Sequence, residues 1–350
     1  MTDFFAALCV PPIPLPVKTL QLLSLLCLAS ALFAQEPVPE GTLNKFLDRE
    51  SKEVTGQLAL MQQEVYQLKT ELQVLAFRQE YGDRIALRRV MFPANTADRE
   101  AIPGYIFTPK TLAAGKKYPG LVMVHGGNHV QLTGEWFPWI VGAIERGYVV
   151  LFPEYRGSSG HGETIYKNNY GVTDLADVLA GTAFFAAQPF VDAARLGVFG
   201  HSRGGMLCLR TLEVEPQRFK AAVDVAGLSD MVAFMSYKSD ARRKQIAADA
   251  HYGGKLPGEN LAAYVDVSPA FHIEKIETPV LLLSTTGDKT VPYQLHNKRV
   301  LEALKAYGKV HDAHLYEQAP GGHEFLFVDS PEGTDSMRRT FEWFAKYLKP

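Results

Sequence analysis

The chain has 350 residues, of which 47% are apolar and 21% are charged, a composition typical of a globular protein with one large domain or two small ones. Its formal net charge is −2 and it has no dense run of Lys and Arg. Composition therefore argues against nucleic acid or an anionic membrane surface as a partner and favours a small substrate.

Residues 1–34 predict an export signal. Lys18 precedes an apolar run that is about as long as the hydrophobic region of a signal peptide and short for a membrane span, and a polar stretch with prolines follows. Small residues offer cleavage after Ala31 or Ala34. We therefore expect an exported protein, periplasmic or extracellular, with no membrane anchor after cleavage; an uncleaved anchor is the alternative.

Residues 35–80 predict a helical extension, because residues 42–79 contain no proline, a single glycine, and many Leu, Gln, Glu and Lys. Seven apolar residues follow one another at alternating spacings of four and three: Val54, Leu58, Met61, Val65, Leu68, Leu72 and Leu75. This spacing is typical of a coiled-coil seam, so one hypothesis is a homo-oligomer formed through residues 42–79. The alternative is an amphipathic helix that packs this stripe against its own chain.

Residues 81–350 show the pattern of an α/β domain. Eight strands are predicted: an antiparallel pair at 84–92 and 101–109, and six short strands that begin near residues 120, 148, 195, 221, 279 and 313. Most of the six are apolar on both faces, and helix-length segments lie between them. This alternation predicts a mostly parallel eight-stranded sheet covered by helices on both faces, with ligands bound beyond the carboxyl ends of the strands.

The third of these six strands ends in Gly200-His201-Ser202-Arg203-Gly204, at the start of a predicted helix. Gly-x-Ser-x-Gly at such a position can hold a nucleophilic serine on a turn too tight for side chains on the neighbouring residues. The pattern alone arises by chance in about one chain in ten of this composition, so it needs partners elsewhere in the sequence.

Asp288 and His323 supply those partners. Acyl transfer requires a histidine that takes the proton of the serine and a carboxylate that fixes the imidazole. Asp288 follows a buried strand and His323 follows two glycines after the last strand, so the order Ser, Asp, His is that of α/β-hydrolases. Asp312 is the rival acid, but it precedes a strand. His201 is expected to pack within the turn.

The backbone amides of Gly127 and Arg203 are the predicted donors of an oxyanion hole. Candidate substrate contacts lie just after strands or in the long insert at 228–276: His125, Tyr155, Arg156, Met231 and Phe234. For Arg156 the alternative is an internal ion pair, and the insert could pack a small core of its own. No cysteine or carboxylate cluster accompanies the paired histidines, so neither a metal nor a cofactor is expected.

The chain resembles the catalytic domain of the prolyl oligopeptidase family of serine hydrolases, particularly its acylaminoacyl and dipeptidyl peptidase branches. The resemblance runs from about residue 101 to the C terminus and rests on five blocks in the same order: VMVHGGNH, LFPEYRGSSGHG, GVFGHSRGG, SPAFHIEKIETPVLLLSTTGDKTVPYQ and APGGHEF. It implies an α/β-hydrolase fold, Ser202 as nucleophile with Asp288 and His323, and an oxyanion hole that includes Gly127 and Arg203.

The chain departs from the family pattern in three places. Asn128 stands where those peptidases often have proline, and Ser284-Thr285-Thr286 replaces their common His-Gly, but neither removes a catalytic group. Family peptidases usually carry a large N-terminal β-propeller, whereas a predicted helix precedes residue 81 here. The expected function is an exported serine hydrolase that cleaves peptide or aminoacyl bonds. The alternatives are a carboxylesterase or deacetylase with the same triad, and an inactive hydrolase-fold scaffold that uses the helix.

Overall fold

The computed structural model describes residues 40–166 and 170–350. The chain divides into two compact units, Met1–Leu60 and Met61–Pro350, and the predicted site lies in the second. The predicted export signal at 1–34 lies outside the described residues, so export stays a prediction. Within the described ranges, no helix is both long enough and apolar enough to cross a membrane.

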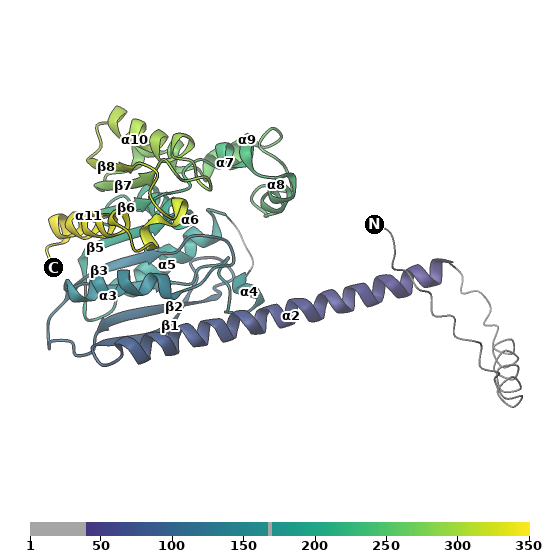
Figure 1. Ribbon diagram of the computed structural model, residues 1–350, viewed down its shortest axis with the longest axis horizontal. Helices are drawn as coiled ribbons and strands as arrows, with labels where there is room; N and C mark the ends of the chain where they lie inside the picture. The colour runs from purple at the N-terminus through teal and green to yellow at the C-terminus, as the bar shows by residue number, and fades with distance from the viewer. Residues whose placement is uncertain (1–39, 167–169) are drawn as a thin grey trace, which may run out of the picture. The chain divides into compact units, whose positions relative to one another are not determined.

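The second unit contains a single eight-stranded sheet, as the sequence predicts. Its order is β1-β2-β4-β3-β5-β6-β7-β8 (Figure 1). Strand β2 is antiparallel to both of its neighbours, β1 and β4, and all other neighbouring strands are parallel. The predicted fold class is therefore confirmed. The strands are β1 (Ile85–Pro93), β2 (Ala101–Pro109), β3 (Tyr118–Val124), β4 (Val149–Pro153), β5 (Val191–His201), β6 (Ala221–Val225), β7 (Val280–Thr285) and β8 (His311–Tyr316).

Helices cover both faces of this sheet. One core contains residues of α5, α6 and α10, and the other contains residues of α3, α11 and the end of α2. The helices are α2 (Glu40–Tyr81), α3 (Phe137–Glu145), α4 (Glu163–Tyr166), α5 (Thr173–Ala186), α6 (Arg203–Val214), α7 (Met231–Tyr237), α8 (Asp240–Ala247), α9 (Leu261–Asp266), α10 (Asn297–Ala306) and α11 (Pro331–Leu348). Short 3₁₀ turns are η1 (Gly134–Trp136), η2 (Pro269–Phe271), η3 (Ile273–Lys275), η4 (Tyr293–Leu295) and η5 (Gly322–Phe327).

The side chains of β3 are buried on both faces of the sheet, which explains its apolar sequence. Val122 and Val124 belong to one core, while Leu121 and Met123 belong to the other. Successive side chains of a strand point to opposite faces, so a strand with helices on both sides must be apolar at every position. The parallel register then places the carboxyl ends of the central strands at one edge, with Val124 of β3 beside the end of β5.

The end of α2 packs against the α/β body. Val74 and Phe77 are buried, and the ring of Phe77 lies 5.0 Å from the rings of both Phe107 and Phe137. Glu71 forms a bidentate ion pair with Arg89 of β1 at 2.7 Å. These contacts make the last turns of α2 part of the domain.

The apolar stripe singled out in the sequence does not make these contacts. Its members in the second unit are 58–64% exposed: Met61, Val65, Leu68, Leu72 and Leu75. The interpretation that this stripe packs against its own chain is therefore wrong, because a different side of the helix is buried. The homo-oligomer hypothesis stays a prediction.

Replacing Phe77 by Ala should lower the free energy of unfolding by about 3–5 kcal/mol, because it removes a buried ring and leaves a cavity. Chemical denaturation measures the change. Val214→Ala, at a position that is 54% exposed, is the matched control and should shift stability by less than about 0.5 kcal/mol. Equal effects of the two changes would show that the packing of α2 does not stabilise the domain.

Candidate active site

Ser202 lies on a sharp turn between β5 and α6. Its backbone has φ 59° and ψ −119°, a conformation that residues with side chains rarely adopt. A Cβ atom on Gly200 would lie 2.0 Å from the carbonyl oxygen of Gly204, and one on Gly204 would lie 2.0 Å from the carbonyl oxygen of Val124. Glycine is therefore required on both sides of the serine, which is the steric reason for the sequence pattern.

The structure brings Ser202, His323 and Asp288 together at the edge of the sheet. Nε2 of His323 lies 2.8 Å from Oγ of Ser202, and Nδ1 of His323 lies 2.7 Å from Oδ2 of Asp288. Oδ1 of Asp288 accepts hydrogen bonds from the amides of Thr290 and Val291, each at 2.8 Å. These bonds hold the carboxylate in place beside the imidazole.

The alternative residues have other positions. Asp312 is exposed within β8, and the carboxylate beside His323 is that of Asp288. His201 is buried, and its Nε2 lies 2.9 Å from the carbonyl oxygen of His323. Burial, together with the nearby His323, lowers the pKa of His201 to about 3. A neutral His201 therefore donates a hydrogen bond that supports the loop of His323.

Gly127 and Arg203 line the same cavity as Ser202. Arg203 is the first residue of α6, where backbone amides have no partner within the helix. A Cβ atom on Gly126 would lie 2.8 Å from Cβ of Ser202, so glycine allows the loop after β3 to approach the serine this closely. The two segments that carry the predicted amide donors therefore meet beside Ser202.

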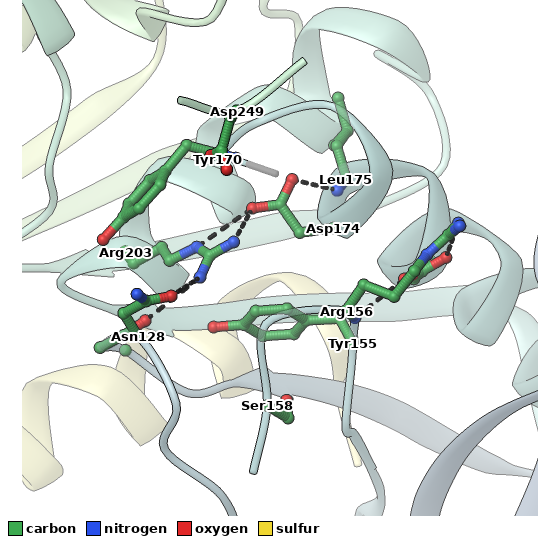
Figure 2. A network of polar contacts seen from close by, with 12 residues as sticks. Asn128, Tyr155, Arg156, Ser158, Tyr170, Asp174, Leu175, Arg203 and Asp249 are labelled. Carbon is green, nitrogen blue, oxygen red and sulfur yellow. Dashed lines mark hydrogen bonds and ion pairs between the residues drawn. The ribbon is translucent and has the colours of Figure 1, made fainter. Parts of the chain in front are cut away.

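The side chain of Arg203 joins three segments in a buried network (Figure 2). Its Nη2 and Nε lie 2.5 and 3.1 Å from Oδ2 of Asp174, and its Nη1 donates to Oδ1 of Asn128 at 3.2 Å. The guanidinium also lies 4.2 Å from the ring centre of Tyr170 and 5.3 Å from that of Tyr155. Burial alone would lower the pKa of Arg203, but the Asp174 carboxylate raises it above its usual value. Arg203 therefore stays charged and connects the Asn128 loop to α5.

Sequence reasoning did not identify Asp174. Its signal is a pair of carboxylates, Asp174 and Asp177, at the start of a helix that is otherwise mostly apolar. Both are buried, and a buried carboxylate needs a charged or hydrogen-bonding partner. Asp177 pairs with Arg156, whose Nη2 lies 2.6 Å from Oδ1 and whose Nε lies 2.8 Å from Oδ2.

Among the five candidate substrate contacts, Phe234 lines the cavity beside Ser202 and the other four do not. Arg156 forms the internal ion pair that was its alternative. The hydroxyl of Tyr155 donates to the carbonyl of His125 at 2.7 Å, and Nε2 of His125 lies 2.9 Å from Oγ of Ser158. Met231 is fully buried in the core. These four side chains have structural partners that account for their positions.

The cavity beside Ser202 has a volume of about 270 Å³. The insert at 228–276 contributes to its wall, and Met231 and Met235 pack into the main core of the domain, not into a separate small core of the insert. A larger hollow of about 720 Å³ lies between α2 and the β1–β2 pair and contains no predicted site residue. The lining of the smaller cavity is Gly127, Asn128, Tyr170, Ser202, Arg203, Leu228, Phe234, Lys238, Arg242, Thr290 and Val291.

One cluster near the site has ligand types that could hold a metal. His201, His323 and Glu324 each offer one atom, and these atoms lie within 4.8 Å of one another. Both ring nitrogens of His323 are already engaged, one by Ser202 and one by Asp288. A metal at this position would have to displace one of these two contacts.

The sequence model of the prolyl oligopeptidase family matches residues 135–350. The chain belongs to the prolyl oligopeptidase family. This membership confirms the resemblance, and four of its five sequence blocks lie within the matched range.

Relatives of this prolyl oligopeptidase family member share its sequence over most of the α/β domain. The acylamino-acid-releasing enzyme of Arabidopsis thaliana is 27% identical, over 70% of this chain and 32% of its own length. Mouse dipeptidyl peptidase 8 is 29% identical, over 61% of this chain and 24% of its own. The chain therefore spans less than half of the length of either relative.

Solved structures support the same fold. An acylaminoacyl peptidase of Pyrococcus horikoshii matches with a TM-score of 0.66 at 22% identity, covering 78% of this chain and 44% of that one. A puromycin-hydrolyzing peptidase of Mycobacterium tuberculosis matches with a TM-score of 0.63 at 25% identity, covering 75% of this chain and 39% of that one. The sheet and helices described above are thus those of the α/β-hydrolase peptidases.

A buried carboxylate lies beneath the serine turn. Asp224 of β6 is fully buried, and a Cβ atom on Gly205 would lie 2.2 Å from its Oδ1. Burial raises the pKa of Asp224 from its usual 3.8 to about 8, against a smaller lowering by the backbone amide of Gly227. The folded protein therefore keeps this carboxyl protonated at neutral pH.

Replacing Asp224 by Asn should reduce the pH dependence of stability. Between about pH 4 and about pH 8, the folded wild-type chain holds a proton that the unfolded chain has lost, so its free energy of unfolding falls as pH rises through this window. Urea denaturation across this window should show a smaller fall for Asp224→Asn. The exposed Asp312→Asn should behave as wild type, and identical slopes for all three proteins would contradict the prediction.

Proposed function

We propose that this chain is a serine hydrolase that cleaves peptide or aminoacyl bonds through an acyl-enzyme. Ser202 is the nucleophile, His323 is the general base and then the general acid, and Asp288 fixes the imidazole. One observation carries the proposal: the unbroken hydrogen-bonded chain from Ser202 through His323 to Asp288, with distances of 2.8 and 2.7 Å. These distances suit proton transfer.

In the first half of the reaction, Oγ of Ser202 attacks the substrate carbonyl while its proton passes to Nε2 of His323. The imidazolium that forms is stabilised by the carboxylate of Asp288. Negative charge develops on the carbonyl oxygen and is stabilised by the amides of Gly127 and Arg203. The tetrahedral intermediate then releases the amine, which takes the proton from His323, and the acyl group stays on Ser202.

In the second half, water enters and gives its proton to Nε2 of His323 as its oxygen attacks the acyl carbon. A second tetrahedral intermediate forms at the same amides. Its collapse breaks the bond to Oγ of Ser202, and His323 returns the proton to the serine. The products are a free amine and a carboxylic acid, and the enzyme is restored.

The comparisons favour a bond to an amino acid over a simple ester. The relatives and structural neighbours include an acylamino-acid-releasing enzyme, an acylaminoacyl peptidase and a puromycin-hydrolyzing peptidase. An ester hydrolase would use the same groups, since it differs in the leaving group and not in the triad. Turnover of blocked and free aminoacyl anilides, compared with short acyl esters, separates these two functions.

Ser202→Ala should abolish labelling by a fluorophosphonate probe, because the nucleophile is lost. Asp288→Asn should slow turnover by roughly 10³- to 10⁴-fold, because the imidazole loses the partner that fixes its tautomer. Gel fluorescence and steady-state rates measure the two effects. Asp312→Asn is the matched control and should keep the wild-type rate. A wild-type protein that folds but does not label would reject the hydrolase and favour the scaffold alternative.

A further inference from the structure

The cavity beside Ser202 has a positive lining. Lys238 and Arg242, from the insert, line it together with Arg203, and no Asp or Glu is among its described lining residues. Arg203 is neutralised by Asp174. In the described part of the chain, neither Lys238 nor Arg242 forms an ion pair with a carboxylate. Two carboxylates outside the lining act on these cations, Asp249 on Arg242 and Asp288 on Lys238. Among the described residues, the lining itself therefore carries two cations with no carboxylate in contact.

Both cations are held in place by neutral groups. Nη2 of Arg242 donates to the hydroxyl of Tyr170 at 2.7 Å, and its guanidinium lies 5.9 Å from the centre of that ring. Nζ of Lys238 donates to the carbonyl oxygen of Thr290 at 3.1 Å and lies 4.3 Å from the ring centre of Phe234. Partial burial, and then the charge of Arg242, lower the pKa of Lys238, against a smaller raising by Asp288. An anion in the cavity would favour the charged form of Lys238.

We propose that the substrate carries a carboxylate close to its scissile carbonyl, and that Lys238 and Arg242 bind this carboxylate. This inference rests on the proposed function. The cavity of about 270 Å³ is large enough for a short acidic side chain. Charge-assisted hydrogen bonds from a lysine and an arginine to one carboxylate are stronger than neutral ones, so the two residues would select an acidic substrate over its amide.

Thiobenzyl esters of N-acetylglutamate and N-acetylglutamine test this inference, because they differ only in the charge of the side chain and their thiol leaving group suits peptidases and esterases alike. We expect wild-type kcat/KM to favour the glutamate ester by at least roughly tenfold. Lys238→Gln with Arg242→Gln should bring the ratio close to one. Arg243→Gln is the matched control, because Arg243 pairs with Asp240 outside the cavity and should leave the ratio unchanged.

Three results would overturn the inference: equal rates for the two esters, a ratio that survives the double change, or turnover of neither ester by a protein that still labels at Ser202. Failure of the wild-type protein to label would instead reject the proposed function.

A second inference comes from the two faces of α2 in residues 61–81. The face that packs on the domain is formed by residues Tyr66, Thr70, Val74, Phe77 and Tyr81, spaced by four, four, three and four. The apolar stripe is formed by Met61, Val65, Leu68, Leu72 and Leu75, which are 58–64% exposed. With 3.6 residues per turn, these two sets lie on opposite sides of the helix. The stripe is therefore open to a partner that need not displace the domain.

We infer that the stripe binds a second copy of this chain in a parallel coiled coil. Its spacing of four and three is that of heptad positions a and d, and in the sequence Val54 and Leu58 extend it toward the N terminus. Glu64 then occupies position g and Lys69 position e of the next heptad. In a parallel pair in register, Glu64 of each copy faces the partner's Lys69, which makes the helix complementary to itself.

Sedimentation equilibrium of the full chain should give the mass of a dimer, and Leu68→Glu with Leu72→Glu should give that of a monomer, because charges in the seam would be buried without partners. Gln67→Glu, on the same turn but outside the seam, is the matched control and should remain a dimer. Oxidation of Leu68→Cys should form a reducible dimer, and Gln67→Cys should not. A monomeric wild type, or a dimer that survives both glutamates, would overturn the inference.

Discussion

The backbone conformation of Ser202 is the constraint on which the site depends. A positive φ on a residue with a side chain costs on the order of 1–3 kcal/mol, and it persists only where the surroundings enforce it. Here β5 is paired on both sides, by β3 and β6, and α6 begins at the next residue. The turn between them has space only for glycines beside the serine. The stability of the central sheet therefore holds the strained turn, and the turn presents the hydroxyl beyond the sheet edge.

The other two groups of the proposed triad reach this hydroxyl on loops that follow β7 and β8. Each loop is fixed by buried contacts: the carboxylate of Asp288 by two backbone amides, and the loop of His323 by the neutral ring of His201. His201 immediately precedes the serine, so the turn that positions the nucleophile also supports the histidine. Preorganisation of this kind means that little rearrangement is needed when charge develops in the reaction.

Sequence reasoning found the eight strands and the three residues that meet at the edge, because each leaves a local pattern: apolar runs, glycine pairs, and a motif with defined spacing. It did not find Asp174, because the partner of a buried charge can lie anywhere in the chain. It also proposed Tyr155 and Met231 as substrate contacts, and both are buried in the core. A position at the end of a strand predicts which edge a residue occupies, but not whether its side chain points into the cavity or away from it.

The segments outside the common sheet are where this chain can differ from its relatives. The serine turn and the two loops belong to the fold and leave the choice of substrate open, because a triad acts on any carbonyl that reaches it. The insert at 228–276 supplies Phe234, Lys238 and Arg242 to the cavity wall. It is anchored by Met231 and Met235 in the main core, so its charged residues are held in place by the same packing that stabilises the domain. We therefore expect the selectivity of this protein to depend on an insert that the catalytic chemistry itself does not require.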